Sequence, residues 1–310
     1  SGLYNLKPDY QLKVMKWFVE SKRRKTNDQV KRETAKYRMW QEWAKIAEEK
    51  LVNQDDLETV IRLIENNSFR TESQLMAKIR DLNSKAENKL ICGDAVRELE
   101  NIEDGSIDLV ITDPPYGIDY SSNRSENDSH ITREKIANDR DLQTSLRLLD
   151  NTMKILMSKT KPDAHFYVFT SWKVYPEFMK VIEKYLDVKN LIIWDKGNHG
   201  TGDLEGAWGN RYEMIIFATK GERKLVKRKP DIIQVPKVPA QQMIHPTQKP
   251  EAVITELLEA SAQPYDTVCD PFMGSGSTIK AVKEFGLDLK YIGIELDRER
   301  FDKAAAYIGG

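Results

Sequence analysis

The sequence predicts an α/β protein with a doubly wound, mostly parallel sheet and an N-terminal helical unit. From about Lys89 onward, short apolar runs rich in Ile and Val alternate with helical patterns, which is typical of a sheet buried between helices. Before that point, apolar residues recur only at helical spacing. We therefore expect a helical unit over residues 1–87 and an α/β domain over residues 88–310.

The N-terminal unit contains three stretches in which apolar residues recur every three or four positions, as on one face of a helix. These residues are Leu12, Met15 and Val19, then Leu57, Ile61 and Ile64, then Leu75, Ile79 and Leu82. A basic run, Lys22, Arg23, Arg24 and Lys25, follows the first stretch. The run favours contact with an anionic partner. A scaffold or dimerisation role fits the unit equally well.

Seven apolar runs supply the predicted strands of the α/β domain. They are KLICGD, IDLVITD, AHFYVFTS, NLIIWDK, YEMIIFATK, DTVCDP and YIGIELD. Two polar segments, residues 118–140 and 221–246, interrupt them and read as loops. The second is basic and carries Arg223, Lys224, Lys227, Arg228 and Lys229, so we expect it to contact an anion.

Composition argues against a membrane-spanning or secreted protein. The formal net charge is −1, and no apolar run is long enough to span a membrane. No signal-peptide pattern opens the sequence. Cys92 and Cys269 each lie in an apolar stretch, and no ligand spacing for a metal is present. The two thiols look like small core residues, which predicts a reducing compartment, no disulfide and no metal site.

The segment DPPY, residues 113–116, follows the predicted strand DLVIT. In doubly wound sheets, ligands bind at the carboxyl ends of the strands. Neither Pro114 nor Pro115 has an N–H, and an ionised Asp113 only accepts hydrogen bonds. The acceptors around Asp113 would therefore receive the hydrogens of an exocyclic amino group. Tyr116 offers an aromatic face on which a base could stack. A plain Pro-Pro turn at a strand end is the alternative interpretation.

A second motif, DPFMGSGST at 270–278, joins a strand to a helix through a glycine turn. Glycines allow a ligand to approach the backbone closely, and a helix N-terminus favours anionic groups. The next strand ends at Glu295, where a carboxylate can accept hydrogen bonds from ribose hydroxyls. These two strands together predict a nucleoside site.

Four ordered motifs, DPPY at 113–116, HPTQKP at 245–250, DPFMGSGST at 270–278 and GIELD at 293–297, resemble the β-class amino-methyltransferases of DNA. In that class the DPPY motif precedes the cofactor motif, in a permuted Rossmann-like methyltransferase fold, and the same order holds here. The resemblance covers about residues 88–310. It implies S-adenosylmethionine as cofactor, double-stranded DNA as partner, and a cytoplasmic enzyme encoded by a bacterium or phage.

The resemblance also implies roles for individual residues. Asp113, Pro114, Pro115 and Tyr116 would be catalytic, and Asp94 would contact the adenine of the cofactor. Glu295 would hold the ribose. The methionine end would be lined by Asp270, Phe272, Gly274, Gly276, Ser277 and Thr278, and closed over by Thr247, Gln248 and Lys249. His245 reads as structural.

A short target-recognition region is expected near residues 197–245. The basic residues in 22–25 and 223–229 would contact DNA. The implied reaction is methylation of N6 of a flipped adenine. N4-cytosine methylation is a rival, although those enzymes more often carry Ser in place of Asp113. A catalytically silent nucleic-acid-binding subunit is a second rival. A homodimer and a restriction enzyme are candidate partners that the residues leave open.

Overall fold

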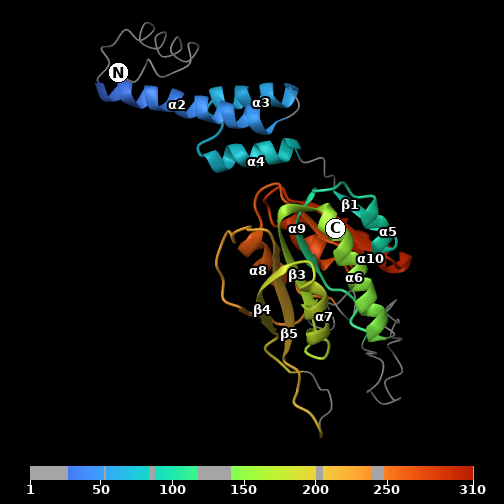
Figure 1. Cartoon of the computed structure of the whole chain (residues 1–310). Coiled ribbons are helices and arrows are strands. Elements are labelled where there is room, and N and C mark those ends of the chain that lie inside the picture. The colour runs from blue at the N-terminus through green and yellow to red at the C-terminus, as the bar shows by residue number, and fades with distance from the viewer. Residues whose placement is uncertain are drawn as a thin grey trace. The chain divides into compact units, whose positions relative to one another are not determined.

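The computed structural model describes residues 27–51, 54–83, 88–117, 141–199, 205–238 and 248–309. The chain divides into two compact units, residues 1–85 and 86–310 (Figure 1). The first unit contains the helices α2 (Asn27–Lys50), α3 (Gln54–Glu65) and α4 (Glu72–Asn83). The helices predicted from the second and third apolar stretches are therefore confirmed as α3 and α4. The first stretch and the run Lys22, Arg23, Arg24 and Lys25 lie outside the described residues.

The helical unit has a core of its own. Trp40 and Trp43 of α2 are buried together with Ile64 of α3 and Leu75 and Ile79 of α4. These side chains stand three or four positions apart within each helix, so each helix turns one apolar stripe inward. Apolar burial of this kind stabilises helices whose isolated segments would be marginal.

The second unit contains one eight-stranded sheet with the strand order β1-β8-β7-β2-β3-β5-β4-β6. The strands are β1 (Lys89–Cys92), β2 (Ile107–Thr112), β3 (Thr160–Thr170), β4 (Asp187–Asp195), β5 (Tyr212–Lys220), β6 (Ile232–Gln234), β7 (Thr267–Asp270) and β8 (Lys290–Glu295). All seven predicted strands are present. The short edge strand β6 was not predicted. β5 runs antiparallel to β3 and β4, and the other five pairings are parallel.

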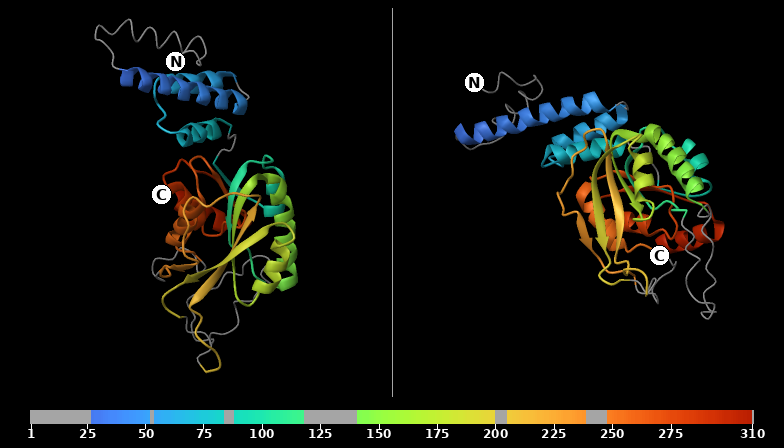
Figure 2. Two further views of the ribbon diagram at one scale, coloured as in Figure 1. Left: turned by 60° about the vertical axis from the view of Figure 1, so that its left-hand side comes forward. Right: turned by 60° about the horizontal axis from the view of Figure 1, so that its bottom comes forward.

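Helices cover both faces of this sheet. The helices are α5 (Ala95–Glu100), α6 (Leu142–Lys159), α7 (Tyr175–Ile182), α8 (Glu251–Ser261), α9 (Ser277–Glu284) and α10 (Arg298–Gly309). One core cluster joins α5, α6 and α7 to the sheet, and another joins α8 and α9 to it. The left view of Figure 2 shows the green helices and the orange and red helices on opposite sides of the strands.

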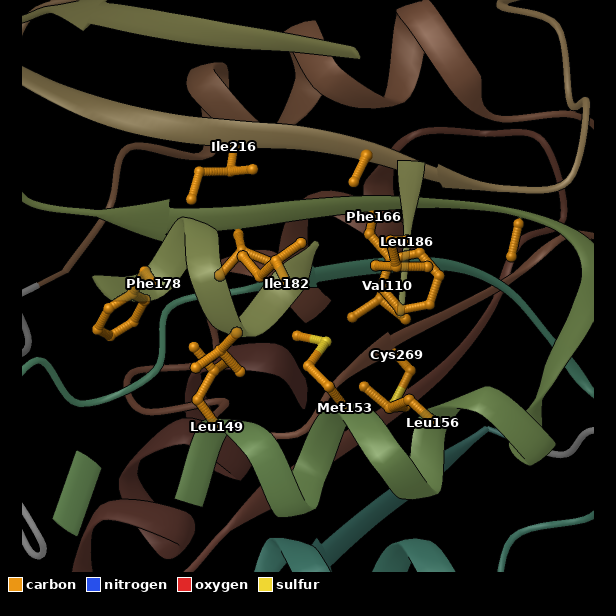
Figure 3. Close-up of a cluster of buried hydrophobic side chains, with 14 of the residues drawn as sticks. Val110, Leu149, Met153, Leu156, Phe166, Phe178, Ile182, Leu186, Ile216 and Cys269 are labelled. Carbon is orange, nitrogen blue, oxygen red and sulfur yellow. The ribbon is translucent and has the colours of Figure 1, made fainter. Parts of the chain in front are cut away.

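Strand β2 shows why the sheet is buried on both faces. Its side chains alternate, so that Val110 joins the cluster under α6 and α7 while Leu109 and Ile111 join the cluster under α8. Figure 3 shows Val110 with Met153 and Leu156. A continuous apolar run such as LVI is what burial on both faces requires. The predicted doubly wound, mostly parallel α/β fold is confirmed.

Strand direction defines the two edges of the sheet. Strands β1, β8, β7, β2, β3 and β4 end at one edge, where β5 begins, and we call this the carboxyl edge. The opposite edge is the amino edge. Among the described residues, no helix is long and apolar enough to cross a membrane. Cys92 and Cys269 are both free thiols.

Candidate active site

Four acidic side chains stand in a row along the carboxyl edge. Asp94 follows β1, Glu295 ends β8, Asp270 ends β7 and Asp113 follows β2, and these four strands are consecutive neighbours in the sheet. Backbone and side-chain contacts join the row. Gly93 N donates to Glu295 O at 2.9 Å, and Thr112 Oγ1 donates to Asp270 Oδ1 at 2.9 Å. The two sequence motifs therefore converge on one edge, as their strand-end positions predicted.

Asp113 is a half-buried carboxylate with a donor at each oxygen. Tyr116 Oη donates to Oδ1 at 2.5 Å, and Lys249 Nζ donates to Oδ2 at 2.5 Å. The Tyr116 ring is buried and meets Phe178 edge-on, with the ring centroids 5.9 Å apart. The stacking role of Tyr116 stays a prediction, because in this structure its ring packs into the core. Pro114 is buried beside it and adds no donor.

Lys249 lies between two carboxylates rather than in open solvent. Besides its contact with Asp113, its Nζ lies 3.3 Å from Glu213 Oε2 and 5.3 Å from the ring centre of Phe169. Burial by itself would lower the pKa of Lys249, but Asp113 and Glu213 outweigh it and raise the pKa above its ordinary value. The predicted role of Lys249 over the methionine end of the cofactor stays a prediction.

Glu213 was not predicted as a site residue. It lies near the start of β5, and its Oε1 accepts from Lys196 Nζ at 2.5 Å. Burial would raise the pKa of Glu213, but Lys249 and Lys196 lower it below the ordinary range. An acid at the start of a buried strand, YEMIIFATK, was the available signal. The signal was insufficient because Glu213 lies a hundred positions from Asp113, and only the sheet order brings them together.

Asp270 is the most deeply buried acid of the row, at 2% exposure. Its Oδ1 accepts from Thr112 Oγ1 and, at 3.1 Å, from Phe272 N. Thr278, at the start of α9, also hydrogen-bonds to this carboxylate. Burial raises the pKa of Asp270 to about 7, against the pull of these hydrogen bonds. A carboxylate held this way has a strong preference for a cationic partner.

Gly274 and Gly276, the two glycines of the turn, have different surroundings and therefore different roles. Gly274 has φ +53°, and a Cβ there would meet only Phe272 O at 3.9 Å, so its surroundings are open. Gly276 has φ +81°, and a Cβ there would come within 2.8 Å of Ile308 Cδ1 on α10. The missing side chain of Gly274 leaves room for a ligand. The missing side chain of Gly276 lets α9 begin against α10.

Glu295 connects the end of β8 to this turn. Its Oε2 accepts from Gly274 N at 2.9 Å, and its Oε1 accepts from Asp297 N at 2.9 Å. A carboxylate has about four acceptor positions, so two remain for hydroxyl donors. The side chain of Asp94 caps α5, accepting from Arg97 N at 3.1 Å, and its predicted contact with the adenine of the cofactor stays a prediction.

Residues 107–306 match the model of the DNA methylase family that transfers methyl groups to N6 and N4 amines. The chain belongs to this family. It is 30% identical over 250 residues to the Type II methyltransferase M.HpaI of Haemophilus parainfluenzae, covering 70% of this chain and 74% of that protein. It is 28% identical over 260 residues to the DNA adenine methyltransferase YhdJ of Escherichia coli K12, covering 70% and 84%.

Solved structures show the same fold. The M1.HpyAVI–SAM complex superposes with a TM-score of 0.54 at 24% identity, covering 71% of this chain and 98% of that one. The cytosine-N4-specific PvuII DNA methyltransferase superposes with a TM-score of 0.55 at 18% identity, covering 71% and 86%. The family assignment confirms the predicted class of enzyme, a DNA amino-methyltransferase that uses S-adenosylmethionine.

The residues of this methylase fit S-adenosylmethionine chemically. The buried Asp270 prefers a cationic partner such as an α-amino group, Gly274 leaves open space beside it, and Glu295 keeps acceptor positions for hydroxyls. Ser277 and Thr278 are buried at the start of α9. The assignment of these residues to the cofactor stays a prediction.

The HPTQKP motif lies only partly within the described residues. His245 and Thr247 fall outside them. Gln248 is buried, and its Nε2 donates to Tyr307 Oη of α10 at 3.0 Å. Gln248 thus anchors the start of α8 to the C-terminal helix. Its predicted role over the methionine end stays a prediction.

The predicted DNA contact of the segment 223–229 stays a prediction, and the place of the segment in the fold does not favour it. Because β5 is antiparallel, this segment leaves the sheet at the amino edge, away from Asp113. The side chain of Arg223 is 8% exposed and forms ion pairs with Asp266 and, at 3.5 Å, with Asp108. Asp108 precedes Asp113 by five residues of extended chain, which places Arg223 about 17 Å from the carboxyl edge.

The remaining basic residues of this segment lie at the same edge. Lys227 pairs with Glu259 at 2.9 Å, and Lys229 pairs with Glu256 and, at 2.9 Å, with Glu259. The backbone N–H of Lys227 donates to Ala260 O at the end of α8. Lys224 and Arg228 are exposed, and they belong to the same segment at the amino edge.

Proposed function

We propose that this methylase transfers a methyl group to the N6 amino group of an adenine flipped out of double-stranded DNA. The observation that carries the proposal is the carboxylate of Asp113 at the carboxyl edge, followed by two prolines that offer no competing N–H. An exocyclic amine has two hydrogens to donate, and Asp113 with the Pro114 carbonyl supplies two acceptors.

The chemistry follows from the poor nucleophilicity of an aromatic amine, whose lone pair is delocalised into the ring. Acceptors that hold both amino hydrogens favour a more pyramidal nitrogen and direct its lone pair outward. The negative charge of Asp113 also stabilises the positive charge that develops on nitrogen. S-adenosylmethionine, when bound, supplies a methyl group activated by its sulfonium. Asp270, Gly274 and Glu295 would hold it on the neighbouring strand ends.

The preference for adenine has three supports. Asp, rather than Ser, precedes the Pro-Pro pair, and the relative YhdJ is named as an adenine methyltransferase. N4-cytosine methylation is the alternative, because an enzyme specific for that base shares the fold. A purine also offers the larger area for stacking.

The target amine of a paired base is inaccessible inside the duplex, so the enzyme must unstack the base at a cost of a few kcal/mol. Exposed side chains at the carboxyl edge are placed to offset this cost. Trp172 follows β3 at 53% exposure, and Trp208 precedes β5 at 98% exposure. Lys173 and Lys237 are exposed at the same edge. We propose that DNA contacts these four residues, two of which, Trp208 and Lys237, lie in the predicted recognition region 197–245.

The test is digestion of treated DNA to nucleosides followed by mass spectrometry, with Asp113→Ala as the inactive control. N6-methyladenine from the wild type alone is the expected result. N4-methylcytosine as the main product would show that the target base is cytosine rather than adenine. It would not change the proposed cofactor site. The dimerisation or DNA-binding role of the helical unit, a homodimer and a restriction enzyme partner stay predictions.

A further inference from the structure

The carboxylate of Asp113 is not ready to receive an amine in this structure. Its Oδ2 holds the ammonium of Lys249 at 2.5 Å, and its Oδ1 holds the hydroxyl of Tyr116 at 2.5 Å. An ammonium beside Oδ2 competes for the acceptor that the target amine needs. It also places a positive charge close to a nitrogen that becomes positive during methyl transfer, and like charges repel.

A second acceptor for Lys249 already lies within reach. Glu213 Oε2 is buried and forms an ion pair with Lys249 Nζ at 3.3 Å, but among the described residues it accepts no hydrogen bond of good geometry. A buried carboxylate oxygen without a hydrogen bond is costly, so it favours any donor that moves toward it. A shift of Lys249 by a fraction of its side-chain length would complete this bond.

Glu213 is itself held in place. Its other oxygen, Oε1, accepts from Lys196 Nζ at 2.5 Å, and the side chain of Lys196 is 8% exposed. The two ammonium groups and two carboxylates alternate in sign along the chain Asp113, Lys249, Glu213, Lys196. Glu213 can therefore receive Lys249 without moving, because Lys196 fixes its carboxylate from the other side.

We propose that Glu213 is a positioning residue that draws Lys249 away from Asp113 when the target amine enters. The ammonium keeps all of its protons and exchanges one carboxylate partner for the other. This exchange frees Asp113 Oδ2 as an acceptor and moves positive charge away from the reacting nitrogen. The inference rests on the proposed function, because it assumes that Asp113 receives the amine.

The test compares Glu213→Gln, Lys249→Met and the double variant in single-turnover transfer of tritiated methyl groups to DNA. Glutamine keeps the size of Glu213 but loses the charge that attracts Lys249. We expect Glu213→Gln to lower the single-turnover rate by about tenfold or more, with the Kd for S-adenosylmethionine changed by less than about twofold. In the Lys249→Met background, Glu213→Gln should change the rate by less than about twofold, since the partner is gone.

Glu256→Gln is the matched control, because Glu256 pairs with Lys229 at the amino edge and should leave the rate unchanged. A wild-type rate for Glu213→Gln overturns the inference. An equal loss in the presence and absence of Lys249 overturns it as well, because Glu213 would then act independently of the lysine. A loss of cofactor affinity that matches the loss of rate also overturns it.

Should Glu213→Gln not fold, Glu213→Asp keeps the charge but withdraws the carboxylate from Lys249. A reduced rate for this variant supports the inference, and an unchanged rate overturns it. Tritium reports methyl transfer to either base, so N4-methylcytosine as product would overturn the adenine assignment while the comparison of rates still stands. Failure of the wild type to methylate any DNA would overturn both proposals.

Discussion

The protonation of Asp270 should make cofactor binding depend on pH. Asp270 is 2% exposed, and burial raises its pKa to about 7 from the ordinary 3.8. If its carboxylate pairs with the α-amino group of S-adenosylmethionine, only the ionised form binds well. The Kd should then rise about tenfold for each pH unit below 7, or about 1.4 kcal/mol per unit, and level off above 7.

The same shift sets the sign of a stability change in the free protein. Because the folded pKa lies above the unfolded one, the neutral carboxyl contributes stability that is fully present below pH 3.8 and is lost as the pH rises through 7. The difference between 3.8 and about 7 corresponds to roughly 4 kcal/mol as an upper bound. Asp270→Asn stays neutral, so its stability relative to the wild type should rise over this window.

Isothermal titration of the wild type with S-adenosylmethionine, at about pH 6 in two buffers of different ionisation enthalpy, checks the assignment. Close to one proton should be released on binding, because the cofactor ionises a protonated Asp270. Asp270→Asn should bind weakly at every pH and release none. Asp302→Asn, an exposed acid on α10, is the control. A Kd that stays constant between about pH 5.5 and 7, without proton release, would refute the reasoning.

Four further changes test the structure. Arg223→Met should cost about 3–5 kcal/mol in chemical denaturation, because it leaves the buried carboxylate of Asp266 without its cation, while Asp108 keeps its ion pair with Lys161; a cost below about 1 kcal/mol would contradict this. Gly276→Ala should lower the melting temperature, since φ is +81° and its Cβ would meet Ile308 at 2.8 Å; an unchanged melting temperature would count against the close packing. Trp208→Ala should weaken DNA binding by about 1 kcal/mol or more in a fluorescence titration, whereas equal affinity would remove it from the interface. The double variant Lys224→Ala/Arg228→Ala should leave the salt dependence of DNA binding unchanged in the same titration. A decrease of about 1 or more in the slope of log K against log salt concentration would show that the segment contacts DNA.

Much of the fold could be predicted because local pattern and burial agree. A buried strand must be apolar on both faces, and runs such as LVI in β2 and MIIFA in β5 have no other stable place in a protein of this kind. β6 escaped prediction because only Ile233 of its three residues is buried. An edge strand that short leaves almost no apolar signal in the sequence.

The four acids of the site could be predicted because each is located by the apolar run of a strand. Asp94, Asp113, Asp270 and Glu295 each stand at or just after the end of an apolar run, and parallel strands gather their ends at one edge. Their partners could not be predicted. Whether Lys249 meets Asp113 depends on the conformation of a connection of more than a dozen residues, which no local pattern specifies.

The direction of β5 decides which loops face the substrate, and it is the feature that sequence reasoning lacked. With β5 antiparallel between β3 and β4, the connection that precedes it lies at the carboxyl edge and the one that follows it lies at the amino edge. Positive charge alone favoured the second connection as the DNA contact. The first carries Trp208 and leads into Glu213, the second partner of Lys249. Recognition of DNA and the positioning of Lys249 relative to Asp113 are therefore both expected to depend on one short stretch of chain, so changes in it should alter DNA affinity and methylation rate together.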